Sequence, residues 1–279
     1  MIGLLIALVS LLTFGSSSIF RKRPIRQIGI FSALLLNYVF TSILTLAALL
    51  LFSSIALPSF EIGVILFVEI IVGSAAIVAF YKAVEEGDLS LVSPVAKLSV
   101  VVTLLISLFF LNEILSPLHL VGSAVIIVSA VVIGTRRGRV KNLEHGIFYA
   151  ILTGLGWGVY FALLKPLTLA LGPFNTGFYT EAGIFAVVLI FVLLARKKIS
   201  FTKTASKSIF AGAFLGVAGL ITYNFAIQMI GAALSASVLA ASPAFVALLS
   251  KLYLKEKIAR YKYFAIAGIV LGLIILAIG

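Results

Sequence analysis

Residues 63–83 have the sequence GVILFVEIIVGSAAIVAFYKA, in which Glu69 and Lys82 are the only charged side chains. A helix of about twenty residues crosses the ~30 Å hydrocarbon core of a bilayer at 1.5 Å per residue. The apolar residues do not alternate with polar ones, and the run is about twice as long as a strand of a membrane barrel. This stretch therefore predicts a transmembrane helix that carries one carboxyl group inside it.

Similar apolar runs fill most of the chain, and short breaks with Gly, Pro or charged residues separate them. The predicted spans are residues 2–20, 29–52, 63–83, 89–111, 116–134, 146–169, 173–195, 207–229, 232–254 and 260–278. The first run precedes its basic residues, which is the reverse of the order in a signal peptide, so we expect it to be retained. The fold class predicted is an all-α integral membrane protein with ten transmembrane helices.

The composition agrees with a lipid environment and gives an orientation. Of the 279 residues, 62% are hydrophobic and 11% are charged, whereas soluble domains have about a quarter charged residues. The net charge of +12 arises from short clusters between the apolar runs, which indicates the membrane surface and no nucleic acid partner. Because 19 of the 21 Lys and Arg residues lie on the side reached by odd-numbered runs, we expect that side in the cytoplasm and both termini outside the cell membrane.

Several kinds of chemistry are excluded by the residues present. The chain has no cysteine, so it has no disulfide, thiolate metal site or cysteine nucleophile. Its two histidines, His119 and His145, cannot form a zinc site alone. No phosphate-binding loop or nucleophile–histidine set occurs. We therefore expect no cofactor, no metal, no catalytic residue and no ATP-driven reaction in this chain.

The chain contains an internal repeat, which a constant shift of 143 residues makes visible. The shift pairs Lys22 with Lys165, Gly73 with Gly216, Phe80 with Tyr223, Ser99 with Ser242, and Glu113 with Glu256. The predicted halves are residues 1–143 and 144–279. Because each half has five spans, an odd number, the second half must enter the membrane inverted. Inverted repeats are typical of transporters with a substrate site near the midplane; the alternative is a duplication that only built a stable bundle.

The same two halves carry paired motifs. The first half has Phe14-Gly15 with Lys22, Tyr81-Lys82-Ala83, Ser93-Pro94 and Leu111-Asn112-Glu113. The second half has Trp157-Gly158 with Phe161 and Lys165, Tyr223-Asn224-Phe225-Ala226, Ala241-Ser242-Pro243 and Leu254-Lys255-Glu256. In this order, and over nearly the whole chain, they resemble the EamA-type branch of the drug/metabolite transporter superfamily. Two positions depart from the family pattern: Phe14 replaces a Trp, and Val100 stands where the second half has Pro243.

The resemblance implies export or exchange of small metabolites through a central cavity. That cavity would lie between spans 1–4 and 6–9, and spans 5 and 10 would be peripheral. The small-residue pairs Gly154/Gly158 and Gly212/Gly216 would then allow close packing around the cavity. A third pair, Gly268/Gly272, is expected to pack on span 9, with a homodimer contact as the alternative.

Charged groups inside predicted spans are the first candidates for the site, because they are costly in lipid. Lys97 would attract a carboxylate or phosphate group. Glu69 or Glu181 would bind a cationic group or a coupling proton, since a carboxyl group removed from water holds a proton more readily. For each of the three, a structural ion pair is the alternative. Lys165, near the end of its span, either contributes to the site or extends to the interface.

Uncharged polar and aromatic residues complete the candidate lining. These are Asn37, Tyr38, Trp157, Tyr223, Asn224, Gln228 and Ser242, for several of which an interhelical hydrogen bond is the alternative. Pro94 and Pro243 are candidate helix breaks, because proline removes a backbone donor; a packing kink is the alternative. Glu113 and Glu256 are expected to cap helices or lock hairpins.

These features favour a secondary carrier of a small polar metabolite, such as an amino acid-like solute, working by alternating access as a monomer or homodimer. A membrane enzyme acting on lipid would need His, Asp or Glu clustered at one boundary, and the chain has no such cluster. A scaffold without transport activity would not need polar groups at mid-depth.

Overall fold

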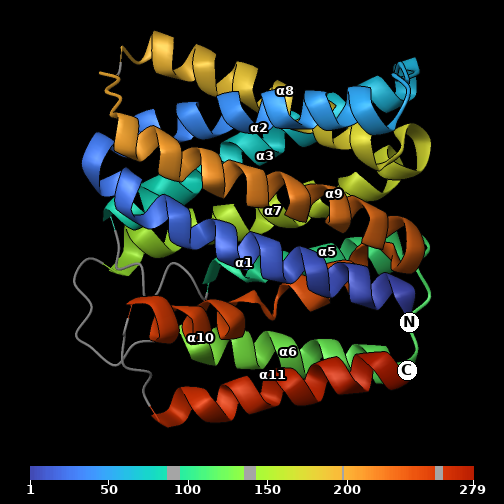
Figure 1. The fold of residues 1–279 in the computed structure, drawn as a ribbon. Helices are drawn as coiled ribbons and strands as arrows, with labels where there is room; N and C mark the ends of the chain where they lie inside the picture. The colour runs from blue at the N-terminus through green and yellow to red at the C-terminus, as the bar shows by residue number, and fades with distance from the viewer. Residues whose placement is uncertain (87–94, 135–142, 197, 255–259) are drawn as a thin grey trace.

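The computed structural model describes residues 1–86, 95–134, 143–196, 198–254 and 260–279, and every regular element in these ranges is helical. The helices are α1 (Ile2–Ile28), α2 (Ile30–Phe52), α3 (Phe60–Glu86), α5 (Leu98–Phe109), α6 (Pro117–Gly134), α7 (Leu143–Leu171), α8 (Pro173–Leu194), α9 (Lys203–Leu239), α10 (Ser242–Leu254) and α11 (Arg260–Ile278). They form one bundle with both chain termini at the same end, which we call the termini end (Figure 1). The all-α prediction is confirmed for these residues.

The prediction of ten spans is confirmed in part. Within the described ranges, seven helices are long and apolar enough to cross a membrane, and Leu98–Phe109 and Pro117–Ile133 form shorter apolar helices. The difference arises at the predicted fourth, fifth and ninth spans, and the ninth is not one helix. Its first part continues α9 beyond Gly231, whose φ of 81° and ψ of 170° interrupt the helical backbone. Its second part is α10, which starts after a turn at Ala240 and Ala241.

Two glycines make the tight turns that join antiparallel neighbours. Gly29 precedes α2 with φ 80° and ψ 163°, and Gly172 precedes α8 with φ 81° and ψ 165°. A residue with a Cβ rarely adopts this positive φ, so glycine is needed at both positions. Pro173 follows in the first turn of α8, where no backbone donor is required.

The interior lies between the two halves of the sequence. The most extensive contacts join α1 with α9, α3 with α7, α6 with α11, α5 with α7, and α2 with α8. Each of these pairs combines a helix of residues 1–143 with one of residues 144–279. Small residues bring α7 close to its neighbours: Gly156 packs on Ala76, and Gly158 packs on Val102. The Thr103 hydroxyl donates a hydrogen bond of 3.0 Å to the Gly158 carbonyl oxygen, so the packing expected of Gly158 is present.

Helices α6 and α11 lie side by side at the lower edge of the bundle in Figure 1. Gly268 lies against Ser129, and Gly272 lies against Ile126 and the backbone of Gly122. The expectation that the Gly268/Gly272 pair would pack on span 9 is therefore wrong, because its partner is α6. The small residues let these two apolar helices approach closely within one chain.

Candidate functional site

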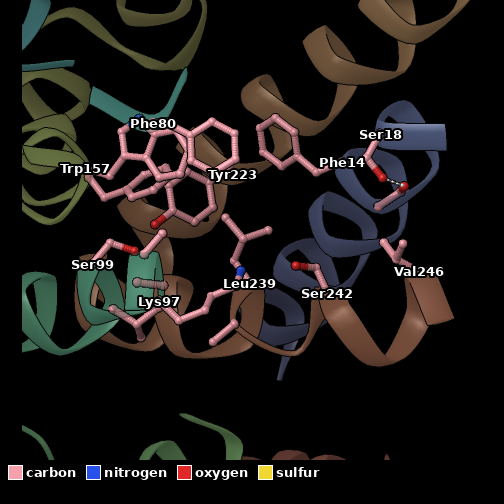
Figure 2. A pocket seen from close by; sticks show the side chains of 16 residues that line it. Phe14, Ser18, Phe80, Lys97, Ser99, Trp157, Tyr223, Leu239, Ser242 and Val246 are labelled. Carbon is pink, nitrogen blue, oxygen red and sulfur yellow. Dashed lines mark hydrogen bonds between the residues drawn. The ribbon is translucent and has the colours of Figure 1, made fainter. Parts of the chain in front are cut away.

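A cavity of about 420 Å³ lies at the interface of the two halves (Figure 2). Helices α1, α3, α5, α7, α9 and α10 contribute to its wall, whereas no residue of α6 or α11 lines it. Five aromatic side chains form much of the surface: Phe14, Phe80, Trp157, Phe161 and Tyr223. The polar side chains that line it are Ser18, Lys97, Ser99, Tyr223 and Ser242. The cavity thus combines large flat apolar surfaces with one charged group, a combination typical of small-molecule sites.

Lys97 supplies the charge of this cavity. It lies in the turn directly before α5, and its side chain is partly buried. Within the described part of the chain, no carboxylate forms an ion pair with Lys97. Figure 2 shows its nitrogen pointing toward Leu239 and Ser242 across one side of the cavity. A lysine at such depth costs about 3 kcal/mol on insertion scales, so an anionic group that enters the cavity would be stabilised there.

Both halves interrupt a helix beside the cavity. The first interruption is at Lys97, where the backbone makes a turn closed by the Val100 N–H and the Lys97 carbonyl oxygen. The second is a turn at Ala240 and Ala241, directly before α10 begins at Ser242. Pro243 is the second residue of α10. Lys97 and Ala240 both line the cavity. Pro94 falls outside the described residues.

A smaller cavity of about 190 Å³ lies beside the first one. Asn37 and Tyr38 of α2 line it, together with Phe80 and Trp157, which also line the larger cavity. The rings of Phe80 and Trp157 are 5.2 Å apart between centroids and form the wall that both cavities share. The Oδ1 atom of Asn37 is buried and has no hydrogen-bond partner.

Neither cavity is lined by the predicted site residues Asn224, Gln228, Glu69 and Glu181. Asn224 is fully buried and donates to the Pro173 carbonyl oxygen at 3.0 Å, and Gln228 donates to the Thr168 carbonyl oxygen at 2.8 Å. These are the interhelical hydrogen bonds that the sequence allowed as the alternative for both residues. Glu69 and Glu181 instead lie near one another, where α3 packs against α8.

The termini end of the bundle contains an ion pair that joins both halves. Glu113, at the end of the α5 segment, has a side chain only 6% exposed and lies 3.0 Å from Lys165 Nζ of α7. Its two carboxylate oxygens also accept hydrogen bonds from the N–H groups of Ala232 and Ala233, at 2.7 and 3.0 Å. These N–H groups begin the helical segment that follows Gly231, so Glu113 caps that segment. The expected capping role of Glu113 is confirmed, while Glu256 falls outside the described residues.

Some lining residues were not predicted. Phe80 is the clearest case, because the 143-residue shift pairs it with Tyr223, which was predicted. Ser99 could have been found in the same way, since the shift pairs it with Ser242. Repeat symmetry, applied to each candidate in turn, was the missing signal for these two positions. The shift pairs Ser18 and Val246 with residues that were not predicted for the site, so it would not have identified them.

Comparison with known proteins adds a family to this geometry. The profile of the EamA-like transporter family matches residues 1–135 and again residues 144–278, which together span nearly the whole chain. The chain belongs to the EamA-like transporter family. It is accordingly a multi-pass membrane protein of a family of transporters, not of enzymes, as the motifs of its two halves indicated.

Individual relatives resemble parts of the chain or its fold. Two proteins described as pseudopaline exporter CntI, from Pseudomonas aeruginosa strains UCBPP-PA14 and PAO1, are each 30% identical over 131 residues. The match covers 47% of this chain and 45% of each exporter, so it spans about half the length of these relatives. One solved crystal structure superposes with a TM-score of 0.83 over 99% of this chain and 96% of its own, at 18% identity. At that identity the superposition shows a shared fold.

Proposed function

We propose that this protein is a secondary transporter that exports a small metabolite bearing a carboxylate group, by alternating access across the cytoplasmic membrane. The observation that carries the proposal is Lys97, a lysine with no carboxylate partner in the described residues, inside a cavity between the two halves. An anionic ligand group would neutralise this charge where water cannot do so fully.

The shape of the cavity supports a ligand of amino acid size. A volume of about 420 Å³ falls in the range of small-molecule sites, which is roughly 300–1,000 Å³. Trp157, Phe161 and Tyr223 offer flat apolar surfaces for the uncharged part of such a ligand. The Tyr223 hydroxyl is buried without a hydrogen-bond partner, so it is available to a polar group of the ligand.

Two comparisons support export by a carrier of this kind. Family membership establishes a transporter, and the curated relatives that match about half of the chain are described as exporters. Exchange of one metabolite for another remains compatible with the same cavity. Neither direction requires a second protein, and the carrier is proposed to act as a monomer or a homodimer.

Repeat-related turns support the proposal of two inverted halves. Gly29 and Gly172, separated by 143 residues, differ by only 1° in φ and 2° in ψ. The interruptions at Lys97 and Ala240 are separated by the same 143 residues. Alternating access in inverted repeats needs such equivalent positions, because each half takes the other's conformation in turn.

Contacts between the halves support the same arrangement. Gly15 packs on Phe245, and the 143-residue shift converts this pair into Val102 and Gly158, which also pack together. Likewise, Thr13 lies against Gly219, and the shift converts this pair into Gly156 and Ala76. Whole helices follow the same pattern. The 143-residue shift takes α1 onto α7 and α9 onto α3, and both the α1–α9 and the α3–α7 pairs are in extensive contact. A twofold axis between the halves explains these reciprocal pairs.

The orientation proposed places both termini outside the cell. It can be tested because the chain has no cysteine, so Ser59→Cys and Asn142→Cys would each provide a single thiol. An impermeant thiol reagent added to intact cells should label Ser59→Cys and leave Asn142→Cys unlabelled until the cells are opened. Labelling of the Asn142→Cys variant alone would reverse the orientation.

The substrate class can be tested by ligand-induced thermal stabilisation of the purified protein. The probes are the proteinogenic amino acids, each compared with its own carboxamide, which removes the negative charge at nearly constant size. We expect at least one amino acid to raise the unfolding temperature and its carboxamide to have no effect. A hit in the screen should then undergo counterflow in liposomes. Equal stabilisation by acid and carboxamide would contradict a role for the carboxylate.

A further inference from the structure

The smaller cavity, of about 190 Å³, contains a buried amide without a partner. Asn37 of α2 is 7% exposed, and its Oδ1 atom has no hydrogen-bond partner within the described part of the chain. Much of the remaining surface is aliphatic and comes from Ile25, Ala33, Leu34, Ile77 and Ile209. A buried amide oxygen is normally bound by a donor, because leaving it bare costs free energy in apolar surroundings. The donor is therefore expected to come from a ligand or from water.

The internal repeat explains why this amide has no partner. The 143-residue shift pairs Asn37 with Thr180, and it converts the contact of α2 with α9 into the contact of α8 with α3. At the second of these contacts, the Thr180 hydroxyl donates to Glu69 Oε1 at 3.2 Å. The same shift pairs Glu69 with Gly212, which has no side chain to offer Asn37. The polar contact between α3 and α8 thus has no counterpart between α2 and α9, and the smaller cavity lies there.

The smaller cavity adjoins the one that contains Lys97. Phe80 and Trp157 line both cavities, and their rings lie 5.2 Å apart between centroids. Aromatic side chains change position by rotation about their χ bonds, without a shift of the backbone. The wall between Lys97 and Asn37 therefore contains groups that can move aside for a ligand.

We propose that the smaller cavity is a specificity pocket for the side chain of the transported metabolite, in which Asn37 accepts a hydrogen bond from a hydroxyl or amide group. This inference rests on the proposed function, in which Lys97 binds the carboxylate of the same molecule. The side chain reaches Asn37 past the rings of Phe80 and Trp157. An acceptor in an otherwise apolar pocket discriminates strongly against a ligand that lacks the donor, because the acceptor is then left bare.

The surroundings of Asn37 favour a neutral donor over a charged one. No carboxylate among the described residues lines this cavity, so a buried ammonium group would lack a countercharge. A hydroxyl or amide group needs only the hydrogen bond that Asn37 offers. The ligand class is therefore an amino acid-like carboxylate with a neutral polar side chain.

The first test compares ligands that differ chiefly in the donor. Threonine with valine, asparagine with leucine, and glutamine with methionine form three such pairs of increasing length. Binding to the purified protein in lipid nanodiscs is measured by the fluorescence of Trp157, which is the only tryptophan of the chain and lines both cavities. In at least one pair, the donor-bearing member should bind about twofold to tenfold more tightly. Equal affinities within every pair would assign the partner of Asn37 to water alone and overturn the pocket.

Variants of the pocket then test the residue itself. Asn37→Leu removes the amide at similar size, so it should abolish the preference by weakening the donor-bearing ligand and not the apolar one. The matched control is Ser123→Ala, which removes a buried hydroxyl of α6 that also has no partner and lines neither cavity. This control should keep the wild-type preference. A preference that persists in Asn37→Leu would overturn the role of Asn37.

A second variant keeps the test decisive if Asn37→Leu does not fold. Ala33→Leu narrows the smaller cavity and leaves the amide in place. It should weaken both members of the preferred pair and leave binding of alanine, which has no long side chain, unchanged. Unchanged binding of the preferred pair would contradict a side chain in this cavity. Size-exclusion profiles identify variants that have lost their fold.

Carboxamides of the same amino acids separate failure of the pocket from failure of the proposed function, because they keep the side chain and lose the negative charge. A donor preference that is equal for acids and carboxamides, without any preference for the acids, would support the pocket and contradict the role of Lys97. Preference for the acids without any donor preference would contradict the pocket alone. If neither series binds, both proposals fail.

Discussion

Lys97 and Lys165 are both lysines within the apolar part of the bundle, and their surroundings differ. Lys165 Nζ lies 3.0 Å from Glu113 Oε1 and also donates to the Leu111 carbonyl oxygen at 3.2 Å. Lys97 has no carboxylate partner among the described residues and faces a cavity of about 420 Å³. The first lysine completes a structural cluster, and the second has a charge that no described carboxylate neutralises and that an anionic ligand entering the cavity would.

The difference separates stability from function. An ion pair with satisfied oxygens and a capped helix segment holds α5, α7 and α9 together at the termini end. The charge of Lys97, which has no carboxylate partner among the described residues, contributes no such restraint and costs free energy until an anion binds. Variants at the two lysines should therefore affect different measurements.

The largest effect is expected for Lys97→Gln on transport. A hydrogen bond to a charged group is worth roughly 1.5–3 kcal/mol, so the loss should lower the affinity for a carboxylate probe by about tenfold to a hundredfold. Counterflow of an amino acid identified by thermal stabilisation provides the measurement. The control is Lys82→Gln, which removes an exposed lysine that lies over the Tyr149 ring. Wild-type counterflow in Lys97→Gln would remove this lysine from the site.

Glu113→Ala is expected to act on folding stability, with an effect of similar size. Removing one partner of a buried ion pair typically costs 3–5 kcal/mol, and the exposure of Lys165, which is 19%, places the expected loss near the lower limit, at about 3 kcal/mol. The loss should appear as a lower unfolding temperature in detergent, with substrate affinity little changed in the protein that remains folded.

A double-mutant cycle sharpens this second expectation. Lys165→Met should destabilise the wild type but add little to Glu113→Ala, because the shared interaction is already absent. Additive losses would show that the two residues act independently. A large fall in substrate affinity in Lys165→Met alone would move this lysine from the structural cluster to the binding site.

The smallest effect is expected at the wall between the two cavities. Trp157→Ala should remove the ring that separates them and weaken binding of a small amino acid by up to about tenfold, given roughly 0.5–1.5 kcal/mol for a lost aromatic contact. The same variant should accept longer side chains better than the wild type. Trp157→Phe preserves an aromatic wall and serves as the control, and an unchanged size preference in Trp157→Ala would contradict a dividing role.

The sequence predicted the helical membrane fold well, because the length of an apolar run and the spacing of breaks are local properties. It also identified Lys97, Trp157, Tyr223 and Ser242, all of which line the larger cavity. It placed Lys165 near the end of its span, where it would join the site or extend to the interface, but it did not predict that this lysine has a carboxylate partner. That partner is Glu113, which lies 52 residues before Lys165 in the sequence and meets it only in the folded bundle.

Helix continuity was harder to predict for the same reason. Pro243 suggested a break inside the ninth span, and the interruption lies just before it, at Ala240 and Ala241. The hydrogen bonds of Asn224 and Gln228 depend on backbone carbonyl groups of α7 and α8 that no local pattern identifies. Pairing each candidate with its repeat mate would have added Phe80 and Ser99 to the cavity lining.

The positive charge at position 97 is the central claim, and chemical rescue tests it most directly. Because the chain has no cysteine, Lys97→Cys would carry the single thiol of the protein, which methanethiosulfonate reagents modify selectively. Attachment of an ethylammonium group should restore counterflow of a carboxylate probe, whereas an ethylsulfonate group of similar size should not. Full activity of unmodified Lys97→Cys, or equal rescue by both reagents, would contradict the account.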